Sequence, residues 1–282
     1  MAEIREVRVP VRVLVRVTRP DAVAIAFARR VSSLSGLPAA LVADGRHAVE
    51  YRGELPLILL TESACRGLGL YCPEDFAWRC GDYGYYLARE RFPDTQHFWM
   101  IETDVYFPAG AERFFSFFAA QPQVDFLSAQ LEPADRSWYW MANAAARNVQ
   151  PFRCLFSVTR LSARAIDAAL RQRRLPSRRM LRRQLWPNDE ALVATTLVNA
   201  GFECRDFNDF GIQFYSPDTF SYQRPLDGER LPEAQGVCMM HPVVTGAAYG
   251  AKLVARQFRH RGLLERAWRK TLWQLNGRLR QW

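Results

Sequence analysis

Two carboxylates lie two residues apart near the end of an apolar stretch of the sequence. The stretch FWMIETDVYF carries Glu102 and Asp104 among aromatic and aliphatic residues. A buried carboxylate without a partner is costly, so a metal ion, a basic side chain or solvent must compensate this pair. Hard divalent cations such as Mg²⁺ or Mn²⁺ take oxygen ligands, often one or two carboxylates together with phosphate oxygens. The alternative is that one carboxylate is a helix cap or ion-pair partner and the other faces water.

The elements around this pair alternate between strand and helix patterns. VRVLVRV at 11–17 has β-branched residues in near-strict alternation, and Asp21 and Gly36 are typical start and stop residues of the helix that follows. This β-α-β order predicts a mostly parallel sheet flanked by helices. The predicted strands are 11–17, 38–44, 55–61, 97–107, 124–131, 152–162 and 202–207. The predicted helices are 18–36, 80–93, 110–121, 162–175 and 187–201, with a basic helix after 237–244.

Polar side chains follow three of the predicted strands. Thr18 and Arg19 follow the first strand, Asp44 ends the second, and Glu102 and Asp104 end the fourth. Ligands of an open α/β sheet bind beyond the carboxyl ends of its strands. Residues two apart on a strand point the same way, so both acidic side chains of the fourth strand are expected to face one ligand.

This order of features resembles that of GT-A glycosyltransferases, which use nucleotide sugars. Their signature is Asp-x-Asp, or a variant such as Glu-x-Asp, at the end of a central strand, and Glu102, Thr103 and Asp104 match it. The resemblance extends over about residues 10–245. It implies a Rossmann-like GT-A fold in which Asp104 binds a divalent metal that holds the donor diphosphate, with Glu102 near the ribose or the metal. Glutamate at the first position departs from the commonest pattern.

The resemblance also implies where the nucleotide binds. GT-A enzymes hold the base and ribose on the first β-α loop and at the end of the second strand. In addition, WRCGDYGYY places Arg79 and Asp82 where this fold usually contacts the nucleotide, although Asp82 also suits a helix N-cap. In this sequence the first β-α loop corresponds to Val17, Thr18 and Arg19, and the end of the second strand corresponds to Asp44.

Two further segments match catalytic positions of the family. WPNDEALV resembles the helix start that carries the general base of inverting GT-A enzymes, so Asp189 and Glu190 are candidates to accept the acceptor hydroxyl's proton. The alternative is a favourable acidic first turn of a helix. His241 in VCMMHPVV resembles the C-terminal metal ligand of many GT-A enzymes and would favour Mn²⁺ over Mg²⁺. Its alternative is a hydrogen-bonded core histidine.

Basic residues concentrate in two stretches of a chain whose net charge is +9. Residues 252–282 contain nine basic residues and one acid, and residues 171–183 contain seven arginines and no acid. Such stretches suit an anionic membrane, glycan or nucleic acid. Leucines and Trp268 between 264 and 279 recur at helical spacing, which is typical of a basic amphipathic helix on an anionic membrane surface. A helix packed on its own domain is the alternative.

Other features of the sequence bound the remaining possibilities. The six cysteines form no Cys-x-x-Cys pair, so reduced thiols are expected and zinc is not. No run approaches the roughly 20 apolar residues of a membrane span, and the N-terminus lacks a signal-peptide core, so we expect a cytoplasmic protein. The basic C-terminal helix adds the expectation of peripheral contact with the inner face of the membrane. Trp138, Tyr139 and Trp140 are candidates for a sugar-stacking platform, and Asn143 for a hydrogen bond to a sugar.

The resemblance implies one GT-A-like catalytic domain over 1–250, and the charge pattern predicts a basic helical extension over 251–282. The predicted activity is transfer of a sugar from a nucleoside-diphosphate donor to a glycan or lipid-linked acceptor, in surface polysaccharide or glycoconjugate synthesis. One alternative is a non-catalytic glycosyltransferase-like scaffold or binding protein docked on a membrane. A weaker one is a nucleic-acid-associated protein, although no nucleic-acid-binding module is recognisable.

Overall fold

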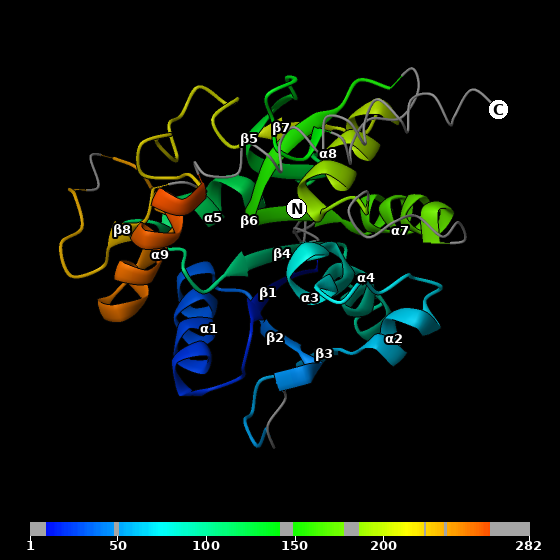
Figure 1. Ribbon diagram of the computed structural model, residues 1–282, viewed down its shortest axis with the longest axis horizontal. Helices are drawn as coiled ribbons and strands as arrows, with labels where there is room; N and C mark the ends of the chain where they lie inside the picture. The colour runs from blue at the N-terminus through cyan, green and yellow to red at the C-terminus, as the bar shows by residue number, and fades with distance from the viewer. Residues whose placement is uncertain are drawn as a thin grey trace, which may run out of the picture.

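A computed structural model describes residues 10–47, 51–141, 149–177, 186–222, 224–233 and 236–259. These residues form an α/β fold with a seven-stranded sheet between helices (Figure 1). The strands are β1 (Val11–Val17), β2 (Ala39–Asp44), β3 (Leu57–Leu60), β4 (His97–Glu102), β5 (Phe126–Pro133), β6 (Phe152–Ser162) and β7 (Cys204–Asp206). The helices are α1 (Ala22–Ser35), α2 (Glu62–Gly67), α3 (Phe76–Arg79), α4 (Asp82–Arg91), α5 (Glu112–Ala119), α7 (Ala163–Ser177), α8 (Asp189–Asn199) and α9 (Gly246–Arg259).

The sheet is mostly parallel, as the sequence predicts. Its strand order is β3-β2-β1-β4-β6-β5-β7, and only β6 runs antiparallel to its neighbours. From β1 the chain builds outward to β2 and β3, and then crosses back to place β4 on the other side of β1. The strand order therefore reverses between β1 and β4. In open α/β sheets this reversal opens a ligand crevice beyond the carboxyl ends of the two strands.

The sheet is buried on both faces, which explains its continuous apolar strands. In β4, Phe98 and Met100 pack on the side of α2, α3, α4, α7 and α8, whereas Trp99 and Ile101 pack on the side of α1 and α5. Trp99 lies against Phe114, Phe115, Phe118 and Phe207 at ring centroid distances of 5.3–6.1 Å. This alternation directs Glu102, the last residue of β4, to the face that carries α3, α4 and α8.

The caps of α1 agree with the predicted boundaries. Asp21 accepts a hydrogen bond from the Ala24 backbone N–H at 2.9 Å, which satisfies one of the free donors at the helix start. Gly36 ends the helix with φ of 67°, a left-handed conformation that glycine adopts without strain. The turn that α1 starts from therefore lies directly beyond the end of β1, at the crevice.

A small parallel pair, β8 (Leu226–Asp227) and β9 (Val243–Val244), lies beside the main sheet, and α9 packs against β8. The predicted C-terminal basic helix begins as α9, but its apolar face at 264–279 lies outside the described residues. Among the described residues, no helix combines the length and hydropathy that a membrane crossing requires. The predicted sugar contact Asn143 also lies outside the described part of the chain.

Candidate active and metal site

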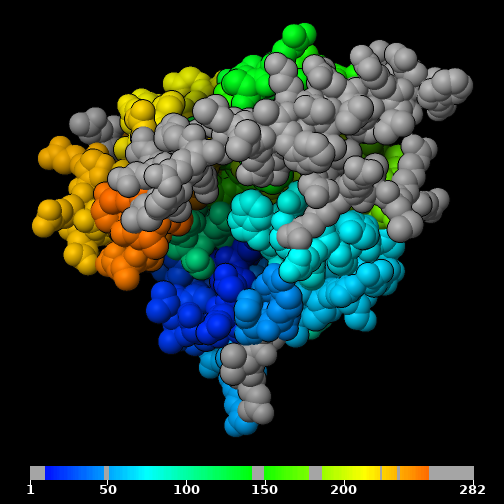
Figure 2. All heavy atoms as spheres, in the orientation of Figure 1, coloured from blue at the N-terminus to red at the C-terminus, as the bar shows by residue number. Residues whose placement is uncertain are grey.

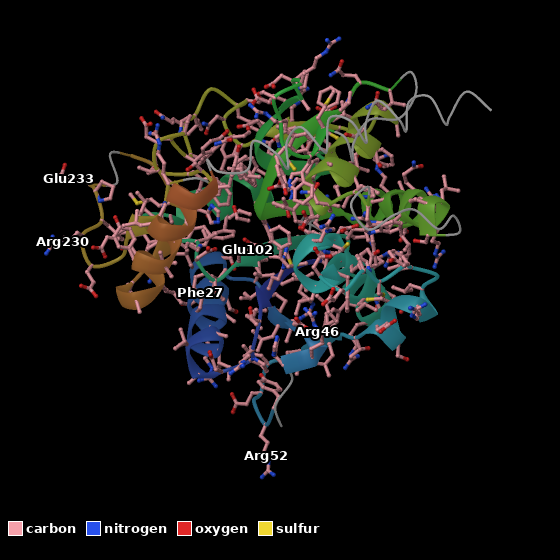
Figure 3. All side chains as sticks on the ribbon, viewed as in Figure 1. Phe27, Arg46, Arg52, Glu102, Arg230 and Glu233 are labelled. Atoms are coloured by element: carbon pink, nitrogen blue, oxygen red, sulfur yellow. The ribbon has the colours of Figure 1, made fainter. Side chains whose placement is uncertain are left out.

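The acidic pair follows the central strand, but only its first member belongs to the strand. β4 ends at Glu102, and the chain then turns, with the Val105 backbone N–H donating to the Glu102 carbonyl at 3.2 Å. Asp104 therefore lies in the turn, so the expectation that strand alternation points both side chains the same way is wrong. The turn brings them together instead. Figure 3 shows Glu102 where β4 ends, between α1 and α3, with Arg46 beyond it near the end of β2.

His241 meets both carboxylates because its segment returns beside the turn. Tyr106 and Met240 exchange two backbone hydrogen bonds at 2.9 Å, and the Val243 N–H donates to the Asp104 carbonyl at 2.7 Å. The His241 Nε2 atom lies 3.4 Å from an Asp104 oxygen and 4.0 Å from a Glu102 oxygen. Hence the structure brings together the three residues that the sequence proposed around the metal.

We call Glu102, Asp104 and His241 the ligand cluster. One ligand atom from each lies within 4.8 Å of the others, which suits a single cation with two oxygen ligands and one nitrogen ligand. The His241 Nδ1 atom lies 3.0 Å from the Ser221 carbonyl oxygen, an arrangement in which Nδ1–H donates and Nε2 is left to bind a metal. The donor chemistry of the cluster therefore fits a divalent cation.

A lysine from α9 completes this side of the site. The Lys252 ammonium lies 2.6 Å from an Asp104 oxygen. Burial alone would raise the pKa of Asp104, but the hydrogen bond from His241 and the charges of His241 and Lys252 lower it well below its ordinary value. Asp104 is therefore a carboxylate that stays ionised. No local pattern pairs Lys252 with Asp104, because the two residues lie 148 positions apart.

Arg16 joins the ligand cluster to the start of α8. It is the penultimate residue of β1, next to Glu102 in the strand register, and its guanidinium lies 3.1 Å from Glu102 and 3.3 Å from Asp189. It also donates to the Trp78 carbonyl at 2.7 Å. Sequence reasoning missed Arg16, although an arginine near the carboxyl end of an otherwise buried strand is itself a signal.

Asp189 and Glu190, which we call the acid pair, open α8. Asn188 caps this helix by accepting from the Ala191 N–H at 3.1 Å, and Asp189 accepts from the Gly81 and Glu190 N–H groups at 2.9 Å. Burial raises the pKa of Asp189 to about 7, against the influence of Arg16. Burial and the Asp189 charge raise the pKa of Glu190 to about 8. Both carboxyls of the acid pair therefore have pKa values near neutrality.

Gly81 allows the close approach that holds Asp189 in place. A Cβ atom at this position would lie 2.5 Å from the Asp189 carboxylate and would overlap the Arg16 guanidinium. Only glycine therefore lets the backbone donate to Asp189 here while Arg16 reaches the same oxygen.

The predicted nucleotide residues near β1 and β2 lie at the same edge of the sheet. Val17 ends β1 in the core, and Thr18 and Arg19 follow it on the surface. Asp44 ends β2, where hydrogen bonds from Arg46 outweigh burial and lower the pKa of its carboxyl. On the face shown in Figure 2, the surface is hollowed between the blue N-terminal segments and the cyan segment that carries α3.

Asp82 does not face the crevice. It is fully buried in the first turn of α4, where both carboxylate oxygens accept from Arg173 at 2.6 and 2.8 Å and one accepts from Tyr86. Gly81, not Asp82, precedes the helix, so the N-cap alternative is also wrong. Arg173 is equally buried, which removes it from the predicted anionic-ligand surface at 171–183; residues 178–185 lie outside the described chain.

Arg79 is also largely buried. It forms an ion pair with Asp75 at 2.8 Å and donates to the Trp186 carbonyl at 3.3 Å, while its guanidinium lies 5.2 Å from the Trp140 ring centre. Arg79 therefore joins α3 to the Trp140 ring and to the segment before α8. Its predicted contact with a nucleotide stays a prediction.

Comparisons with known proteins give little beyond this geometry. No family model and no curated protein matches the sequence. Among solved structures, one that is similar is the crystal structure of a glycosyltransferase involved in the glycosylation of the major capsid of PBCV-1. It is 12% identical, with a TM-score of 0.43, over 88% of this chain and 98% of that chain. A likeness this weak does not bear on activity, which has to be judged from the site itself.

Proposed function

We propose that the chain is a metal-dependent glycosyltransferase that uses a nucleoside-diphosphate sugar. The observation that carries the proposal is the convergence, at the reversal point of the sheet, of a metal-ligating cluster and an acid pair whose pKa values lie near neutrality. Transfer of a glycosyl group needs both functions: a cationic anchor for the departing diphosphate and a base for the incoming hydroxyl.

The ligand cluster is the proposed metal site, with Mn²⁺ or Mg²⁺ held by Asp104 and His241 and approached by Glu102. A bound divalent cation would neutralise the negative charge that develops on the diphosphate. Arg16 supports this metal site, because its guanidinium holds the Glu102 carboxylate in place at 3.1 Å. Thr18, Arg19 and Asp44 would hold the nucleoside, because they lie at the ends of the neighbouring strands.

Asp189 is the proposed base of an inverting reaction. Its carboxyl has a pKa near the pH of the cell, which suits a group that must first be ionised and then hold a proton. Arg16 and the Gly81 N–H fix its orientation. Glu190 would share the proton that Asp189 accepts, because the protonation states of the two neighbouring carboxyls are coupled.

Membrane docking through the C-terminal helix, a glycan or lipid-linked acceptor, and a role in surface polysaccharide synthesis remain part of the proposal. The boundary proposed at residue 250 needs one adjustment, because it falls inside α9. Since Lys252 of this helix contacts Asp104, the first turns of the extension contribute to the site.

The test is a thermal-shift screen of nucleotides and nucleotide sugars with and without Mn²⁺, followed by donor hydrolysis. We expect a shift that requires both the metal and a diphosphate, and slow hydrolysis of that donor. Asp104→Ala should abolish both. Asp218→Ala is the matched control, because this aspartate side chain is 83% exposed and forms a surface ion pair with Arg224.

The outcomes separate the alternatives. Binding without any hydrolysis or transfer would favour a glycosyltransferase-like binding protein over an enzyme. Nucleotide binding that is unchanged in Asp104→Ala would contradict the proposed metal site. Salt-sensitive binding of oligonucleotides, in the absence of any nucleotide-sugar effect, would favour the nucleic-acid alternative.

A further inference from the structure

An exposed tryptophan lies beside the candidate site. Trp78, in α3, is 62% exposed, which is unusual for the largest apolar side chain. Its backbone carbonyl accepts from Arg16 at 2.7 Å, and Arg16 in turn lies 3.3 Å from Asp189. The Trp78 backbone is thus two polar contacts away from the proposed base.

Two further rings extend this surface. The centroids of Trp78 and Trp140 lie 6.2 Å apart at an interplanar angle of 48°, and Tyr139 meets Trp140 at 4.8 Å and 80°. Tyr139 is 42% exposed, whereas Trp140 is almost buried. Trp140 also belongs to a small apolar cluster with Ala191, which follows Glu190 directly in α8. The three rings therefore lie in contact with one another beside the first turn of α8, which carries the acid pair.

Polar groups lie next to these rings in the sequence and beneath Trp140. Asp135, Arg136 and Ser137 are exposed before the ring-bearing segment, and the ion pair of Asp75 with Arg79 lies beneath Trp140. An apolar ring face with a rim of hydrogen-bonding groups matches a ligand that has one apolar face and polar edges. A pyranose has this shape, since its axial C–H groups form an apolar face and its hydroxyls form the edge.

We infer that Trp78 and Tyr139, which pack on the buried Trp140, form the binding surface for a saccharide acceptor, with the apolar face of a sugar ring on Trp78. This inference rests on the proposed function, because it assigns the acceptor side of the same site. A sugar on Trp78 would lie next to the segment whose backbone carbonyl accepts from Arg16, the residue that also contacts Asp189. The surface would recognise the ring rather than a particular substituent, since an indole contacts C–H groups and not hydroxyls.

The inference is tested by saturation-transfer NMR with a panel of neutral mono- to tetrasaccharides on the unmodified chain. We expect transfer to ring C–H protons of at least one saccharide. Trp78→Ala should weaken its binding at least tenfold, and Trp78→Phe should restore part of the affinity because it keeps an aromatic face. Leu175→Ala is the control for loss of exposed apolar surface, since Leu175 is 55% exposed on α7.

Thermal shift with Mn²⁺ and nucleotide separates this inference from the proposed function. That shift should be the same in all three variants and in the unmodified chain. Equal saccharide affinity in Trp78→Ala, or no saccharide signal from the whole panel, would overturn the acceptor surface even with donor binding intact. Absence of the nucleotide shift in the unmodified chain would instead count against the proposed function. Preferential capture of a peptide or of lipid vesicles at Trp78 would also overturn the inference.

Discussion

The ligand cluster and the acid pair contain the same kind of group but differ in protonation. Asp104 faces His241 and Lys252, and these partners lower its pKa. Asp189 is buried next to Glu190, and burial outweighs the Arg16 charge and raises its pKa to about 7. The difference comes from the number of cationic partners relative to the burial of each carboxyl. A carboxylate that stays ionised suits a ligand, and one that titrates near pH 7 suits a base.

The largest expected effect comes from removing the proposed proton acceptor, Asp189. Asp189→Asn should lower the turnover number by about 10²–10⁴-fold, the range associated with general base catalysis. Binding of Mn²⁺ to the ligand cluster should change little, because Asp189 is not part of that cluster. Steady-state kinetics and calorimetric Mn²⁺ titration measure the two effects.

Two variants complete this comparison. Asp167→Asn is the control, since its side chain is 43% exposed and pairs with Arg89 away from the crevice. Glu190→Gln should give a smaller loss than Asp189→Asn. A larger loss of turnover in Glu190→Gln than in Asp189→Asn would assign the role of base to Glu190. A loss of Mn²⁺ affinity in Asp189→Asn as large as its loss of turnover would contradict the separation of the two regions.

A third buried carboxylate sharpens the comparison, because its role is structural. Asp82→Asn leaves the fully buried Arg173 without its charged partner, and breaking a buried pair in this way costs about 3–5 kcal/mol. We expect that loss in the free energy of unfolding, measured by urea denaturation, with Mn²⁺ affinity of the folded protein unchanged. If Asp82→Asn keeps its stability but binds nucleotide less tightly, then Asp82 contributes to nucleotide binding as the sequence predicted.

Local sequence patterns were sufficient for much of the fold. The strands at 11–17 and 152–162 and the capped helices α1 and α8 lie where their periodicity and cap residues place them. The antiparallel direction of β6 could not be predicted, because a buried strand reads alike in either direction. The predicted strand at 97–107 ends at Glu102 in the structure, and Tyr106 instead pairs with Met240, which is remote in sequence.

The same limit applies to the candidate site. Glu102, Asp104 and His241 were found through the resemblance to GT-A enzymes, and the structure brings them together. The ion pairs of Arg16 with Asp189 and of Arg173 with Asp82 join residues 173 and 91 positions apart. No local pattern records such pairings, so the contact of Arg16 with Asp189 was overlooked and the buried Asp82 was assigned to the ligand crevice.

Arg16 is the residue that couples the two regions, so its replacement should shift the pH dependence of turnover. With an unmodified base the rate should rise as pH increases through about 7, because only the ionised carboxylate accepts a proton. Arg16→Gln removes a charge that lowers the pKa of Asp189, so the midpoint of this rise should move to higher pH. Arg16→Lys should keep part of the original midpoint. An unshifted profile in Arg16→Gln would exclude Asp189 as the titrating group.

Lys252 offers the smallest and most specific change to the ligand cluster. Its ammonium lies 2.6 Å from an Asp104 oxygen. A divalent cation in the ligand cluster would bind a carboxylate oxygen of the same residue. Lys252→Gln removes a competing positive charge worth about 1 kcal/mol near solvent, so Mn²⁺ should bind about fivefold more tightly in the absence of nucleotide. Electron paramagnetic resonance of free Mn²⁺ measures this without any turnover. Arg224→Gln, a surface charge paired with Asp218, should leave the affinity unchanged. Weaker binding in Lys252→Gln would mean that α9 supports the metal site through this lysine rather than competing for it.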